Sequence, residues 1–234
     1  MTTPTETIET VGISLPEHWV GLPVRRQDFD RTVDNFRHGW REAGMSRVDQ
    51  RRCDLLLQRM RAQLIDGGVL FAGASIEQGL RPDVEPTPDN AETLVAVCTF
   101  SLVTQADLQT DLRLSIPVLF SAFAKRVGES DGATITDLDP PEVCRLPAGR
   151  AVRLRRLYRL TDARGRLDKW FAETYVVPMG DDGTTAGILQ FCTTNVGLAP
   201  EFSELFGGYA ETLTFLAADD PTVMNTRPDA AEEA

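Results

Sequence analysis

The sequence predicts an α+β fold in which an antiparallel sheet of about six strands is covered by helices, an α/β/α sandwich. Three observations lead to this prediction. Apolar residues recur at helical spacing between about 28 and 66, and strand-length apolar runs joined by short turns follow from residue 69 onward. A strongly amphipathic segment after residue 198 then closes the domain.

The length and composition fit one domain. The chain has 234 residues, of which 42% are hydrophobic, enough for a packed core. We expect residues 11–217 to form a single α+β domain with a helical insert at about 28–66. Residues 1–10 are expected to be a flexible N-terminus, and the acidic, apolar-poor residues 218–234 a disordered tail.

The first part of the domain is extended and then helical. Pro16 and Pro23 bracket Trp19 and exclude a helix there. Two helical stripes follow, each made of apolar residues three or four positions apart, or adjacent to such residues. The first consists of Phe29, Val33, Phe36 and Trp40, and the second of Cys53, Leu56, Leu57, Met60 and Leu64.

The middle of the chain changes to strand character. Residues 69–76 ("VLFAGASI") and 94–103 ("LVAVCTFSLV") are apolar runs of strand length, separated by a loop rich in proline and acids. Residues 105–127 are predicted to be helical, with Pro117 breaking or kinking the segment.

The last third predicts a meander of antiparallel strands and a closing helix. From residue 142 onward, strand-like segments alternate with the short turns "DARG" and "DDGT", which is typical of hairpins. After Pro200, an apolar stripe predicts a helix that covers one face of the meander. The stripe consists of Phe202, Leu205, Phe206, Tyr209, Leu213 and Leu216. Gly207 and Gly208 within this helix fit either close packing of its backbone on the sheet or a break in the helix.

Several short motifs resemble those of a known superfamily. They are "ISLPEHW" near the start, "CRLPAGRAVRLRR" in the middle, and "ETYVVPMGDDGTTAGILQFCTTN" with "FSELFGGYAETLTF" near the end. Together they resemble the PsbP/DcrB-like α/β/α sandwich superfamily. Members of that superfamily mostly bind other proteins or assist assembly and share no catalytic residue set. The resemblance therefore implies protein binding and transfers no site residue.

The charge of the chain bears on its partners. Lys and Arg number 24 against 35 Asp and Glu, a formal charge of −11. Nucleic acid and anionic membranes favour positive proteins, so neither is an expected partner. The arginines between residues 47 and 61 scatter around a helix among acidic residues, as on a solvated surface. No secretory signal and no apolar run of 18 residues is seen, so we expect a cytoplasmic protein.

Arginines on one predicted strand form the most distinct local pattern. Arg153, Arg155 and Arg159 share one face of this strand, where they could hold a carboxylate or a phosphate. A second interpretation is a solvated outer face, on which they pair with acids such as Asp168 and Glu173. The three arginines are a possible docking surface for a partner protein.

The sequence predicts no catalytic residue, cofactor or metal site. His18 and His38 have no metal-binding neighbour at helical spacing and no nucleophile motif to serve. No phosphate-binding glycine loop is present. The cysteines lack Cys-x-x-Cys spacing and are expected to be buried, reduced thiols. They are Cys53, Cys98, Cys144 and Cys192.

The sequence favours a non-enzymatic protein-binding module, adaptor or chaperone-like, that uses a sheet face or an open sheet edge in the cytoplasm. The alternative is a small-molecule or lipid-binding protein, or an enzyme, with a cavity between the sheet and the helical insert. A third possibility is a self-assembling structural component. An exposed apolar patch or an uncovered edge would favour the first, and an enclosed apolar pocket the second.

Overall fold

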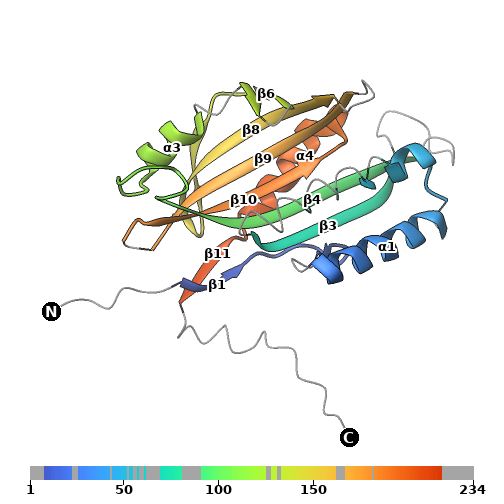
Figure 1. Ribbon diagram of the computed structural model, residues 1–234, viewed down its shortest axis with the longest axis horizontal. Helices are drawn as coiled ribbons and strands as arrows, with labels where there is room; N and C mark the ends of the chain where they lie inside the picture. Colours follow the sequence, from blue (N-terminus) through green and yellow to red (C-terminus); the bar gives the residue numbers. More distant parts are fainter. Residues whose placement is uncertain are drawn as a thin grey trace, which may run out of the picture.

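In a computed structural model the chain has an α+β fold, as predicted, built around one large antiparallel sheet (Figure 1). The structure describes residues 8–22, 26–42, 44–51, 53, 54, 57, 61, 69–80, 91–124, 128–130, 133–161, 167–180 and 182–217. Within these ranges the large sheet has nine strands and a second sheet has two. The expectation of about six strands is therefore wrong.

The large sheet has the strand order β2-β3-β4-β10-β9-β8-β6-β5, and β7 pairs with the same edge of β8 as β6 does. Its strands are β2 (Val20–Gly21), β3 (Val69–Leu80), β4 (Ala91–Thr104), β5 (Gly128–Ser130), β6 (Ala133–Asp137), β7 (Glu142–Leu146), β8 (Gly149–Thr161), β9 (Leu167–Met179) and β10 (Thr185–Thr193). The long strands coincide with the predicted apolar runs. The additional strands are β2, β5 and β6, which have two to five residues each and are too short to produce such a run.

Helices cover both faces of this sheet. They are α1 (Arg26–Glu42), α3 (Ile116–Ala124) and α4 (Ala199–Ala210), and a further helical stretch begins at Arg47. Apolar side chains of α4 pack on one face, and those of α1 and α3 pack on the other. Figure 1 shows α1 along the β3 side of the sheet and α3 beside β8. We refer below to the α4 face and to the opposite face.

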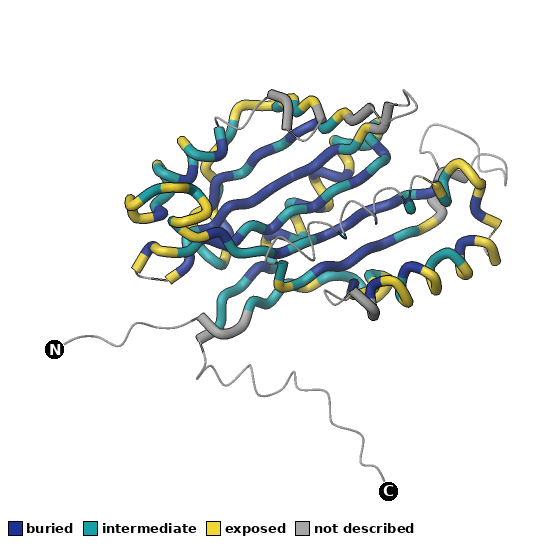
Figure 2. The backbone as a smooth tube through the Cα atoms, viewed as in Figure 1, coloured by how far each residue is buried: buried dark blue, intermediate teal, exposed yellow. Residues whose placement is uncertain are grey.

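Strand alternation assigns side chains to the two faces. In β9, Tyr175 and Val177 join the cluster under α4, whereas Val176 joins the cluster under α3. The side chain of each strand residue therefore points to one face of the sheet or to the other. Figure 2 shows the central strands as mostly buried. Because both faces of these strands are buried, their sequences are nearly continuous runs of apolar residues.

The helical insert shows the predicted apolar stripe. Phe29, Val33 and Trp40 of α1 are buried against β3 and β4, which confirms this helix. In the next helical stretch Cys53 and Leu57 are buried. The other predicted members of the second stripe, Leu56, Met60 and Leu64, lie outside the described residues. The expected flexible N-terminus (residues 1–7 of it) and residues 218–234 of the expected tail also lie outside them.

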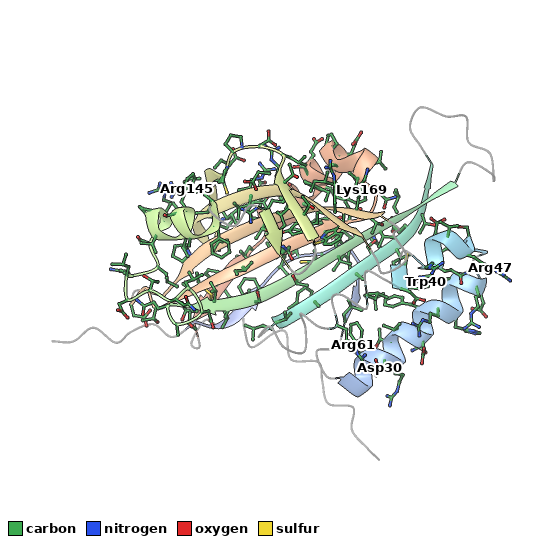
Figure 3. The ribbon with its side chains drawn as sticks, turned by 45° about the horizontal axis from the view of Figure 1, so that its top comes forward. Asp30, Trp40, Arg47, Arg61, Arg145 and Lys169 are labelled. Atoms are coloured by element: carbon green, nitrogen blue, oxygen red, sulfur yellow. The ribbon has the colours of Figure 1, made fainter. Side chains whose placement is uncertain are left out.

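Arginines of the insert lie at its surface, as the charge pattern predicted. Figure 3 shows Arg61 beside Asp30 of α1, and their ion pair is 3.1 Å long. Arg47 is exposed at the start of its helical stretch. Arg52 and Arg59 lie outside the described residues, and Arg47 and Arg61 lie at the solvated surface of the insert.

Two predicted helices are shorter than expected. Of residues 105–124, only Ile116–Ala124 are helical, and residues 125–127 lie outside the described residues. Pro117 lies in the first turn, where proline fits without a kink. The closing helix α4 ends at Ala210, although the apolar stripe continues. Thr214–Ala217 form instead the strand β11, which pairs with β1 (Ile8–Gly12) in the small sheet.

Candidate functional site

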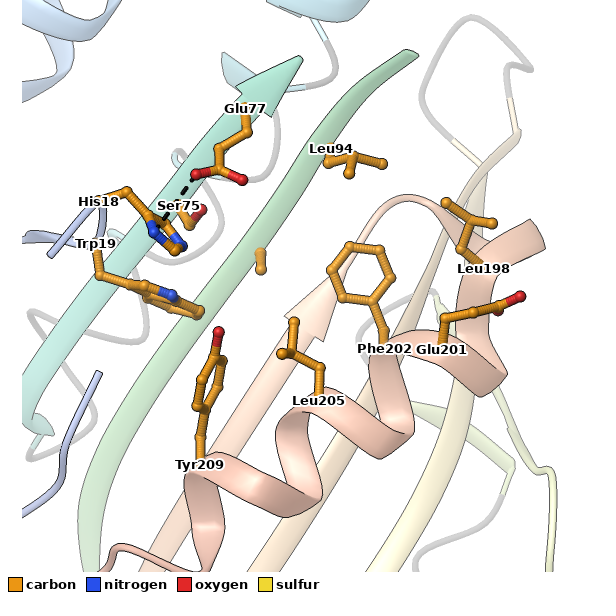
Figure 4. Close-up of a pocket in the computed structure, with 11 residues that line it drawn as sticks. His18, Trp19, Ser75, Glu77, Leu94, Leu198, Glu201, Phe202, Leu205 and Tyr209 are labelled. Atoms are coloured by element: carbon orange, nitrogen blue, oxygen red, sulfur yellow. Dashed lines mark ion pairs between the residues drawn. The ribbon is translucent and has the colours of Figure 1, made fainter. Parts of the chain in front are cut away.

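A groove lies on the α4 face of the large sheet, between α4 and the strands β3 and β4 (Figure 4). Its volume is about 190 Å³, and it is open to solvent on one side. The floor consists of Ser75 and Glu77 from β3 and Leu94 and Ala96 from β4. Residues two apart on a strand point to the same face, which is why these four side chains meet.

One wall of the groove is the exposed side of α4. Phe202, Leu205 and Tyr209 point into the groove, with Leu198 just before the helix. Their spacing of four, three and four residues places them on one helical face. Phe202 is buried, whereas Leu205 is 44% exposed. The wall is therefore apolar and accessible.

Trp19 closes one end of the groove. Its ring meets that of Tyr209 edge to face, with the centroids 5.7 Å apart. The indole Nε1 of Trp19 is shielded from solvent and has no hydrogen-bond partner with good geometry among the described residues. It faces the phenol of Tyr209 (Figure 4), whose pKa is raised mainly by burial, an effect that the nearby indole N–H opposes.

Carboxylates mark the rim of the groove. Glu77 lies 3.5 Å from Nδ1 of His18, and both side chains are about half exposed. Glu201, in the first turn of α4, supplies a second carboxylate. An apolar wall with carboxylates close to it suits an apolar group next to a cation.

The groove also brings together the residue types of a hydrolytic triad. His18, Ser75 and Glu77 all line it. Within the described hydrogen bonds, however, none joins the hydroxyl of Ser75 to His18, and nucleophilic activation requires that contact. Among the described residues, the contact of His18 is with Glu77, at the rim. The arrangement gives no support for acyl transfer.

Behind α4 lies a buried polar network. Glu173 of β9 is fully buried, and its carboxylate accepts hydrogen bonds from Nε of Arg153 (2.8 Å), from the hydroxyl of Ser203 (2.6 Å) and from the hydroxyl of Tyr175. Arg153 also donates to Ser203 (3.1 Å) and to Glu142 (3.0 Å). Because Ser203 belongs to α4, the network fixes this wall of the groove to the sheet.

Burial and charge shift the pKa values in this network. Burial and the charge of Glu173 both raise the pKa of Tyr175, so its phenol stays protonated. Burial is the largest single effect on Arg153 and lowers its pKa, but the hydrogen bond to Glu173 and the charges of the neighbouring acids together outweigh it, so the pKa of Arg153 is raised. The network therefore holds a charged pair and a neutral phenol.

The three arginines predicted as a docking surface have different surroundings in the structure. Arg153 points into the network under α4. Arg155 pairs with Asp139 (3.1 Å) at the surface, and Arg159 is exposed with Lys169 opposite it on β9. The pairing predicted with Glu173 is made by Arg153, while the side chain of Asp168 lies outside the described residues.

The remaining candidate residues lie apart from one another. His38 of α1 is exposed and lies 3.3 Å from Glu42. None of the four cysteines forms a disulfide. Cys53 and Cys98 are buried, and Cys144 and Cys192 are half-buried. Burial raises the pKa of the Cys192 thiol to about 12.

Within the described residues, no group of three or more His, Cys, Asp or Glu side chains could hold a metal ion. No helix among these residues is both long and apolar enough to cross a membrane.

The groove was not predicted from the sequence. The feature of the sequence that best indicates it is Trp19 between two prolines, because a large aromatic ring in a short extended segment must pack on a neighbouring surface. Leu205 was assigned to the core stripe of the closing helix, and only the position of α4 shows that this residue is exposed.

The chain has few recognisable similarities to known proteins. No family model and no characterised protein matches the chain. Among solved structures, it is similar to LpqN of Mycobacterium tuberculosis, which is involved in cell envelope biogenesis, with 12% identity over 88% of this chain and 82% of that chain. The TM-score is 0.35, so this likeness carries no argument about fold or function. Membership of the PsbP/DcrB-like superfamily stays a prediction.

Proposed function

We propose that the chain is a protein-binding module, adaptor or chaperone-like, and that the groove beside α4 holds an apolar side chain of the partner. The observation that carries this proposal is the exposed apolar wall of the groove, formed by Leu205 with Phe202 behind it. An apolar surface of this kind is stabilised when a partner covers it.

The size of the groove favours a protein partner over a small molecule. Small-molecule sites usually have volumes of about 300–1,000 Å³ and enclose most of the ligand. This groove has about 190 Å³ and is open. A protein interface requires less room, because one aliphatic or aromatic anchor in a shallow pocket contributes much of the binding free energy.

The alternative places a small molecule or lipid between the sheet and the helical insert. The described groove lies on the α4 face, whereas α1 of the insert packs on the opposite face. The groove therefore supports the protein-binding interpretation, and a retained small molecule is the competing outcome of the test.

A matched pair of leucine substitutions tests the proposal. Leu205→Glu places a charge in the groove, beside Glu201 and Glu77. Leu112→Glu makes the same change at a leucine that is 63% exposed, between β4 and α3. Both side chains are solvent-accessible, so both variants should fold, which circular dichroism and thermal unfolding would verify.

The readout is affinity capture of the tagged full chain from the cells that produce it, with mass spectrometry of retained proteins and small molecules. We expect a partner that the wild type and Leu112→Glu retain and that Leu205→Glu loses. Equal recovery on both variants, or a retained small molecule without a partner, would overturn the proposal.

A further inference from the structure

Among the described residues, the outer edge of β3 has few backbone partners along its length. β3 has 12 residues, but its neighbour β2 has only two, and these pair with Gly73 and Ala74. Leu22 adds one hydrogen bond, from its N–H to the carbonyl of Ala72 (2.7 Å). In the part of the chain that the structure describes, no strand pairs with this edge beyond Ala74.

The register shows which backbone groups are open. Successive residues of a strand direct their N–H and C=O groups to opposite sides. The carbonyl of Ala72 points outward to Leu22, and β3 pairs with β4 without a bulge from Phe71 to Leu80. The groups of Ile76, Gln78 and Leu80 therefore also point outward. They form a row that another strand can pair with.

This open edge and the groove form one continuous surface. Ser75 and Glu77 lie between the outward-pointing residues, and their side chains line the groove. A strand added to β3 would lie about 4.8 Å away and would direct every second side chain onto the α4 face. Pairing at the edge thus brings side chains of the partner to the groove.

Charge narrows the class of partner. Glu77 and Glu201 both line the groove, and the contact of Glu77 among the described side chains is His18, at 3.5 Å. The whole chain carries a formal charge of −11. A basic segment would be attracted to this surface, whereas an acidic one would be repelled.

We infer that the partner binds as an added β-strand on β3, with its backbone paired to Ile76, Gln78 and Leu80. One of its apolar side chains lies in the groove, and a lysine or arginine side chain lies at Glu77. The ligand is therefore an extended, basic segment of another protein. This inference rests on the proposed function and adds the mode of binding to it.

Short peptides provide the probe. Displayed peptides of random sequence are selected on the full chain and counter-selected on Leu205→Glu. The peptides that depend on the groove are then synthesised and titrated by fluorescence anisotropy.

Two substitutions of one residue separate strand pairing from binding in the groove alone. Gln78→Pro removes an outward N–H and leaves the pairing with β4 intact, because proline is tolerated where the N–H of an edge strand faces solvent. Gln78→Ala keeps that N–H and controls for loss of the side chain. Circular dichroism would show whether both variants fold.

We expect the selected peptides to contain lysine or arginine and to lose about tenfold or more in affinity with Gln78→Pro, since a lost hydrogen bond and the proline ring both oppose pairing. Affinity for Gln78→Ala should stay within about twofold of wild type. Glu77→Gln should weaken binding and reduce its dependence on salt.

Each other result has a distinct meaning. Groove-dependent peptides that bind Gln78→Pro as well as wild type, or that become helical when bound, overturn the strand-pairing inference and leave the proposed function intact. Failure to select any groove-dependent peptide overturns both.

Discussion

Two arginines of β8 attach covering helices to opposite faces of the sheet. Arg153 reaches Ser203 of α4 through the network around Glu173. Arg156, three positions along the strand and therefore on the other face, donates to the backbone carbonyl of Phe123 in the last turn of α3 (2.6 Å) and to Asp137 (2.7 Å). A cation at the end of α3 also suits the negative pole of that helix.

Removing Arg153 should destabilise the protein strongly. Arg153→Ala would leave the carboxylate of Glu173 fully buried without a cation, and breaking a buried pair in this way costs about 3–5 kcal/mol. Urea unfolding of wild type and variant at neutral pH would measure the free energy of unfolding.

Arg155→Ala is the matched control. Arg155 pairs with Asp139 at the surface, where an ion pair contributes less than about 1 kcal/mol. Equal losses for the two variants would show that Glu173 does not depend on Arg153.

At the scale of single residues, the sequence predicted which arginines share a face but not which of them enters the network under α4. Period-two alternation places Arg153 and Arg155 together. Arg153 enters the network through a contact with Ser203, fifty positions further along the chain. No local pattern contains that contact.

At the scale of elements, the glycines of α4 and β10 differ in how closely neighbouring side chains approach them. Close packing was one of the two predictions for Gly207 and Gly208. A Cβ on Gly208 would meet nothing within 4 Å, and one on Gly207 would make only an ordinary contact with Tyr175. The close approach occurs instead at Gly187 of β10, where a Cβ would lie 2.6 Å from Phe100. Periodicity cannot show this, because it depends on which side chain of β4 lies opposite.

Gly208→Ala should stabilise the protein by about 1 kcal/mol, because alanine is the better helix former and the site has room for its methyl group. Gly187→Ala should destabilise it by about 1–3 kcal/mol through overpacking against Phe100. Thermal and urea unfolding of both variants would measure the changes. A loss of stability in Gly208→Ala would contradict the placement of α4.

Element boundaries were less predictable than element types. The apolar stripe of α4 continues to Leu213, which is fully buried in the same cluster although the helix has ended. The hydroxyl of Thr212 donates to the carbonyl of Tyr209 in the last helical turn (2.7 Å). The chain then becomes a strand because β1 is present to pair with it, and that partner lies at the other end of the sequence.

For the molecule as a whole, stability should fall at alkaline pH. The pKa values of Cys98, Cys192, Tyr158 and Tyr175 are raised, in each case chiefly by burial. The unfolded chain releases these protons from about pH 8.5–10 upward, while the folded chain retains them. The unfolded state then binds fewer protons, so the free energy of unfolding decreases with pH, by up to about 1.4 kcal/mol per pH unit for each group.

Urea midpoints measured from pH 7 to pH 11 would show this decrease. Cys192→Ala should show a shallower decrease, since one of the buried acids is gone. A midpoint that stays constant over the whole range would contradict the burial of these groups.

The pairing of β1 with β11 has a consequence for synthesis. Of the strands that the structure describes, the first in the sequence finds its partner in the last, with Gly12 opposite Thr214. At about 5–20 residues per second, roughly 10–40 s separate the translation of the two strands. During this time the amino-terminal strand is an unpaired edge on the nascent chain, exposed to chaperones and to neighbouring chains on the same message. The small sheet, and with it the finished fold, can form only after translation has passed Ala217.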